Sequence, residues 1–86
     1  MAKHLRYIEG YSGTLEELAQ AIGNMTYDET ACFIEKFAND IKRQADKDLA
    51  NKKPQLASQL YAAANNMYKA KKELDIAWNI CKKYME

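Results

Sequence analysis

The chain has 86 residues and a net charge of +1, from 13 Lys and Arg against 12 Asp and Glu. This length holds a single domain, residues 1–86, and the balanced charge excludes a general attraction to nucleic acid or to anionic membranes. Two cysteines are too few for a disulfide scaffold, and no apolar run approaches the roughly 18 residues of a membrane span. Because no secretory signal precedes the first predicted helix, we expect a reducing cytoplasm as the location.

The first quarter of the chain contains one short predicted helix. Residues 1–11 are compatible with either a short helix or a loop. Thr14 and Glu17 have the spacing of a capping box, and Gly23 stands where a left-handed C-cap belongs. Apolar residues at helical spacing lie between these two signals: Leu15, Leu18, Ala19 and Ile22. The pattern predicts a helix over about residues 15–22.

A long second helix is predicted over residues 27–50. Thr26 and Glu29 repeat the start signal of the first helix, and the sequence Asn51-Lys52-Lys53 ends the second one. Its apolar stripe follows the helical period and consists of Tyr27, Ala31, Ile34, Ala38, Ile41, Ala45 and Leu49.

A third helix is predicted over residues 54–84. Pro54 suits the first turn of a helix, and no glycine or further proline interrupts the segment. Its stripe alternates steps of four and three residues without a charge: Leu56, Leu60, Ala63, Met67, Ala70, Leu74, Ala77, Cys81 and Tyr84.

The two stripes predict how the long helices pack. Each carries an alanine at every seventh residue, in the series Ala31, Ala38, Ala45 and Ala63, Ala70, Ala77. The short connection forces an antiparallel pair, and a turn centred on Lys52 places Ile41 opposite Ala63 and Ile34 opposite Ala70, so that large side chains meet small ones. The predicted fold is therefore all-α: an antiparallel hairpin of two long helices plus a short N-terminal helix, similar to a three-helix bundle and completed into a larger bundle by dimerisation.

Several apolar residues remain outside this pairing. The third helix continues past the start of the second, so its end needs cover from residues 1–25 or from another molecule: Trp78, Ile80, Cys81, Tyr84 and Met85. It also has a second apolar row, made of Ala57, Tyr61, Ala64 and Tyr68. A helix that is apolar on two sides is packed on two sides. We therefore predict a two-fold homodimer whose surface includes Phe33, Phe37, Tyr61, Tyr68 and Trp78.

The residue types that carry chemistry form no pattern typical of an active site. His4 is the only histidine and has no neighbouring ligand at metal-binding spacing. Cys32 and Cys81 are predicted to lie too far apart for a disulfide. We expect no catalytic residue, cofactor or metal, and a non-catalytic protein–protein interaction module that acts as a regulator, inhibitor or adaptor. Its expected partners are a second copy of the chain and another protein.

Two alternatives remain open. The third helix carries lysines near tyrosines, an arrangement typical of nucleic-acid contacts, with Lys69, Lys72, Lys82 and Lys83 as the candidate phosphate ligands. The competing interpretation is a solvated face with ion pairs Lys69–Glu73 and Lys71–Asp75. A small-ligand pocket near Trp78 is a third, minor interpretation, which the close packing of the helices disfavours.

Overall fold

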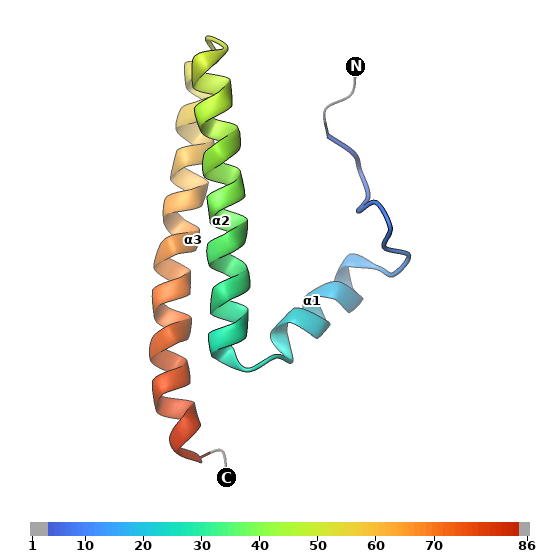
Figure 1. Ribbon diagram of the computed structural model, residues 1–86, viewed down its shortest axis with the longest axis vertical. Coiled ribbons are helices and arrows are strands. Elements are labelled where there is room, and N and C mark those ends of the chain that lie inside the picture. The colour runs from blue at the N-terminus through green and yellow to red at the C-terminus, as the bar shows by residue number, and fades with distance from the viewer. Residues whose placement is uncertain (1–3, 85–86) are drawn as a thin grey trace.

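A computed structural model describes residues 4–84, which form three α-helices and one short 3-10 helix (Figure 1). These are α1 (Leu15–Gly23), α2 (Tyr27–Ala50), α3 (Pro54–Cys81) and the 3-10 helix η1 (Lys82–Tyr84). No strand occurs within residues 4–84. The all-α prediction is confirmed. Met85, which we expected to need cover, lies outside the described residues.

Helix α1 begins as its sequence predicts but ends differently. The Thr14 hydroxyl accepts a hydrogen bond from the Glu17 amide, and the Glu17 carboxylate accepts one from the Thr14 amide, which completes the capping box. The left-handed cap predicted at Gly23 is absent. Gly23 is the last helical residue, and Asn24, with φ −85°, caps the helix by donating its amide to the Gln20 carbonyl. The chain remains right-handed here because it enters α2 only three residues later.

The junction between α1 and α2 depends on a threonine that the sequence pattern did not single out. Thr26 is the N-cap of α2, but its hydroxyl makes no capping bond, contrary to the predicted second capping box. Instead, the Thr30 hydroxyl donates to the Ile22 carbonyl at 2.7 Å. This bond ties the last turn of α1 to the first turn of α2, and it leaves the rest of α1 away from the hairpin (Figure 1).

The turn between α2 and α3 folds the two long helices antiparallel, as predicted (Figure 1). The amides of Asn51, Lys52 and Lys53 donate to the carbonyls of Lys47, Leu49 and Asp48, which satisfies the end of α2. Lys52 has φ 64°, the left-handed conformation that lets so short a turn reverse the chain. Pro54 then opens α3 at its first position, where a missing amide proton costs nothing.

Five alanines form the seam between the helices. Ala31, Ala38 and Ala45 of α2 are fully buried, as predicted, but on α3 the buried residues are Ala57 and Ala64. The predicted series on α3 is therefore wrong, since its members Ala63, Ala70 and Ala77 are only half-buried.

The physical reason is a rotation of α3 by roughly one residue step, about 100°, which turns the row of Ala57 and Ala64 towards α2. This rotation lets Tyr61 and Tyr68 reach polar partners on α2: the Tyr61 hydroxyl donates to Asp46, and the Tyr68 hydroxyl donates to Asn39. Both pairs fit an antiparallel register displaced by less than one turn from the predicted one.

The molecule is a single layer of helices. Its Cα extents are 51 × 30 × 13 Å and its radius of gyration is 15.7 Å, against about 12 Å for a compact chain of this length. Of the two covers expected for the end of α3, residues 1–25 or another molecule, helix α1 does not supply the first: it contacts α2 and not α3. The turn after it lies nearer, with Gly23, Asn24 and Met25 lining a pocket together with Trp78 and Cys81. Ile80 and Tyr84 remain 58% and 81% exposed.

The position of the seam can be tested by overpacking. Ala64→Leu is expected to lower the free energy of unfolding by about 1–3 kcal/mol or more, because the added side chain has no space between the helices. Ala62→Leu, on the exposed back of the same helix, is expected to change it by under about 0.5 kcal/mol. Urea unfolding of both variants at one protein concentration measures the difference, and equal effects would contradict the observed rotation of α3.

The turn predicts a stabilising substitution. Lys52→Gly is expected to raise the free energy of unfolding by roughly 0.5 kcal/mol, because glycine adopts a positive φ without the steric cost that a lysine carries. Asn51→Gly is the matched control, since Asn51 has φ −92° and glycine there only adds freedom to the unfolded chain. Thermal unfolding should rank Lys52→Gly above the unmodified chain and Asn51→Gly at or below it.

Candidate interaction surface

The seam divides the hairpin into two sides of different character. Asn39 and Asp46 each follow a buried alanine of α2 by one residue, and Tyr61 and Tyr68 follow the buried alanines of α3 by four. At about 100° per residue, all four lie on the same side of the seam, as their hydrogen bonds require. We call the side of the hairpin on which these four residues lie the tyrosine side.

The opposite side is apolar. Phe37 precedes Ala38 by one residue, and Leu60 precedes Ala64 by four, so both lie across the seam from the tyrosines. By the same geometry this side consists of Ile34, Phe37 and Ile41 of α2 with Leu60, Ala63, Met67, Ala70, Leu74 and Ala77 of α3, and we call it the apolar side. The alanine series that was predicted for the seam on α3, namely Ala63, Ala70 and Ala77, thus lies on this apolar side, beside the seam.

On the tyrosine side, the polar groups already have partners within the chain. Tyr61 and Tyr68 are half-buried, with their rings against the seam and their hydroxyls bonded to α2. The hydrogen bond from Tyr61 to the Asp46 carboxylate raises the pKa of the phenol, and both desolvation and the negative charge of Asp46 add to the rise. These tyrosines therefore act as interhelical contacts within one chain.

Lys71 continues the row of Ala57 and Ala64 at heptad spacing. Its ammonium lies 2.7 Å from the Asp75 carboxylate, as the sequence predicted. The hydrogen bond to Asp75 raises the pKa of Lys71 against an opposing effect of desolvation, and the charge of Glu35 on α2 adds to the rise. A lysine in place of a third alanine interrupts the apolar seam, and its ion pair with Asp75 lies within α3.

The apolar side holds the larger side chains of the hairpin without burying them. Ile34, Ile41, Leu60, Met67 and Leu74 are half-buried, and no large side chain within residues 4–84 is fully buried. Phe37 is 45% exposed and its ring centroid lies 6.0 Å from that of Phe33, which is 39% exposed. Phe33 and Phe37 therefore lie beside each other on α2, away from Tyr61 and Tyr68 on the opposite side of the seam.

Trp78 lies apart from the other predicted surface residues. It lines a pocket of about 400 Å³ between the turn that joins α1 to α2 and the end of α3. The remaining lining residues are Gly23, Asn24, Met25, Thr26, Tyr27 and Cys81. This pocket is not the one weighed from the sequence, because it lies beyond the paired part of α2 and α3 and not between them.

The candidate phosphate ligands are solvated lysines. Lys69, Lys72, Lys82 and Lys83 are all exposed, the last two in η1. Among the described residues, Lys71–Asp75 forms an ion pair and the predicted pair Lys69–Glu73 does not. Nothing in this arrangement favours nucleic acid over water.

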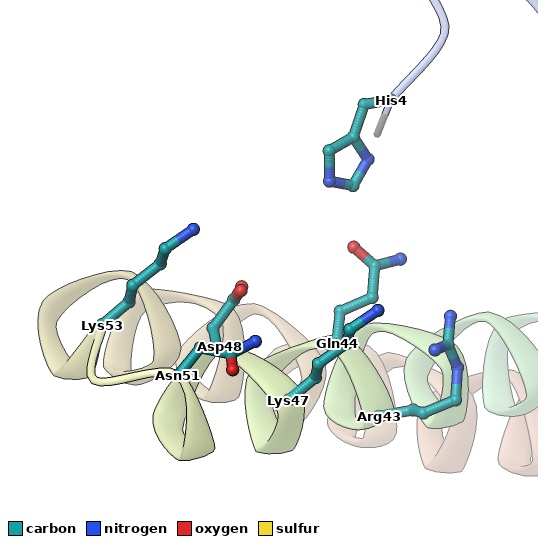
Figure 2. Close-up of a pocket in the computed structure, with 7 residues that line it drawn as sticks. All are labelled: His4, Arg43, Gln44, Lys47, Asp48, Asn51 and Lys53. Carbon is teal, nitrogen blue, oxygen red and sulfur yellow. The ribbon is translucent and has the colours of Figure 1, made fainter. Parts of the chain in front are cut away.

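His4 faces a polar gap beside the outer surface of α2. Figure 2 shows its ring pointing from the N-terminal segment towards Gln44 and Lys47 across an opening of about 200 Å³. The other lining residues are Arg43, Asp48, Asn51 and Lys53. Nowhere in residues 4–84 do three or more His, Cys, Asp or Glu side chains gather as metal ligands would, and Cys32 and Cys81 are both free thiols.

No protein-family model, curated protein or solved structure matches the chain. Across the described segment, no helix combines the length and hydrophobicity that crossing a bilayer requires.

Sequence reasoning missed the apolar side because it assigned those residues to the seam. The signal that identifies them was present: α3 carries two apolar rows, and only one can face α2. Tyrosines mark the row that faces α2, because their hydroxyls need partners and α2 offers Asn39 and Asp46 at the same spacing of seven residues.

The Tyr61–Asp46 contact predicts a titration. Asp46→Ala is expected to lower the raised pKa of Tyr61 towards its ordinary value of 10.0, whereas Asn39→Ala, which removes the partner of Tyr68, leaves it unchanged. Because the folded-state pKa lies above the unfolded one, this contribution to stability is complete below the unfolded pKa and decreases as the pH rises through the folded pKa. NMR titration of labelled tyrosines measures both variants, and an unshifted Tyr61 in the unmodified chain would refute the contact.

Proposed function

We propose that the chain is a non-catalytic protein–protein interaction module that acts as a homodimer. The observation that carries this proposal is the size of its exposed surface. The chain exposes 7067 Å², whereas a compact monomer of 9.9 kDa exposes about 5,200 Å². Part of the excess belongs to the extended segment before α1, and the remainder belongs to the open faces of the helices.

The composition of the core supports the same proposal. Over residues 4–84 the buried core consists of five alanines, and each contributes far less than the roughly 1.5–3 kcal/mol that a fully buried Leu, Ile or Phe provides. Domains of this size gain stability from two packed layers, and the hairpin has one. A second copy of the chain supplies the missing layer.

The module then presents further surfaces to a different protein. Ile80 and Tyr84, together with the pocket at Trp78, lie at the end of α3 beyond the hairpin, and they are candidate contacts for that partner. A regulator, inhibitor or adaptor acts through such a face without chemistry of its own. We also propose that the chain is located in the cytoplasm, because its two free thiols are compatible with reducing conditions.

The test is the mass of the purified chain in solution. Sedimentation equilibrium at tens of micromolar is expected to give twice the mass of one chain, and the midpoint of thermal unfolding is expected to rise with protein concentration. A monomer whose unfolding is independent of concentration would refute the proposal. If a pull-down captures nucleic acid, and this is released as the salt concentration rises from about 50 to 200 mM, the result would instead favour binding through the lysine-rich face of α3.

A further inference from the structure

We propose that the second copy packs on the apolar side, hairpin against hairpin, to form an antiparallel four-helix bundle whose tyrosine sides face water. This inference rests on the homodimer proposed above and adds the surface that forms it. It also removes Tyr61 and Tyr68 from the predicted dimer surface, because their hydroxyls are bonded within the chain.

The first argument is the character of the apolar side. It carries no charged residue between Ile34 and Ile41 or between Leu60 and Ala77, and Asp48 near the turn is the first charge along it. Its large side chains are half-buried, so each retains apolar surface that a second layer would cover. The tyrosine side, by contrast, presents Asn39, Asp46 and Lys72 to water.

The second argument is the fit of the surface to a copy of itself. Ala63, Ala70 and Ala77 repeat every seven residues beside the large residues Leu60, Met67 and Leu74. Alternation of small and large side chains lets two such surfaces interdigitate. A two-fold interface brings identical patches together, so a charged patch would meet its own charge. The apolar side avoids this repulsion because it carries no charge over most of its length.

The third argument is area. The chain exposes 7067 Å², which exceeds the value for a compact monomer by about 1,900 Å². An interface of standard size covers about 800 Å² on each partner, which is less than half of this excess and so leaves room for the share that the segment before α1 exposes. Helix α1 cannot cover this side, because its nine residues extend only about 13 Å and it leaves the hairpin at the start of α2 (Figure 1).

A charged substitution tests the surface. Met67→Lys places an ammonium at the centre of the apolar side, where a single chain leaves it access to water but a dimer buries it. We expect the dissociation constant of the dimer to rise by roughly a hundredfold or more, while circular dichroism shows that the helices persist. Ala62→Lys adds the same charge on the exposed back of α3 and is expected to leave the dimer intact.

A second measurement avoids disrupting the surface. In a chain with Cys32→Ser and Cys81→Ser, a single thiol is introduced by Ala63→Cys on the apolar side or by Lys72→Cys on the tyrosine side of α3. Alkylation of Ala63→Cys is expected to slow roughly tenfold between dilute and concentrated protein. Alkylation of Lys72→Cys is expected to proceed at the same rate in both.

The outcomes separate the two proposals. A chain that is dimeric, yet unaffected by Met67→Lys and protected at Lys72→Cys, would overturn the assignment of the surface and leave the homodimer standing. A monomeric unmodified chain would overturn both. If Met67→Lys unfolds the protein, the thiol protection pattern alone decides, because Ala63→Cys is a small change at a half-buried position.

Discussion

The close approach of α2 and α3 over alanine is the constraint on which the rest of the structure depends. Alanine methyl groups let two helix axes come near each other, but they bury little apolar surface. The larger residues of both helices are consequently displaced to the flanks of the seam, where one partner helix cannot cover them. Thus the alanine seam, which lets α2 and α3 approach closely, also leaves the described part of the hairpin without a core of large side chains.

The larger side chains are accommodated differently on the tyrosine side and on the apolar side. On one flank, the half-buried Tyr61 and Tyr68 donate their hydroxyls to Asp46 and Asn39. An aromatic residue with a polar tip can therefore pack beside the seam while this side remains exposed to solvent. On the other flank, Ile34, Ile41 and Met67 have no polar group with which to do so. Only another apolar surface can remove theirs from water, and this is the physical basis of the dimer proposed above.

The sequence predicts the elements far better than the orientation of α3. The capping box at Thr14, the proline at the start of α3 and the short turn at Lys52 are local signals, and each helix begins where they place it. The end of the third helix has no such signal: it was predicted at residue 84, but α3 ends at Cys81 and continues as the 3-10 helix η1. The choice between the row of Ala57 and Ala64 and the row of Ala63 and Ala70 is not local, because either row fits alanine against α2. It is decided by hydrogen bonds from Tyr61 and Tyr68, whose acceptors become apparent only when both helices are placed together. The open surface could not be assigned before that rotation was known.

The asymmetry of the hairpin also limits the size of the assembly. A layer that is apolar on both sides would add copies without end, since each new layer would present another apolar surface. Here the tyrosine side carries charged and hydrogen-bonded groups, so in the dimer proposed above the two outward hairpin faces are polar. Closed two-fold pairing of this kind uses the same patch on both copies and stops at two. The polar partners of the two tyrosines therefore have two roles: they set the rotation of α3, and in the dimer proposed above they keep the outward tyrosine sides polar.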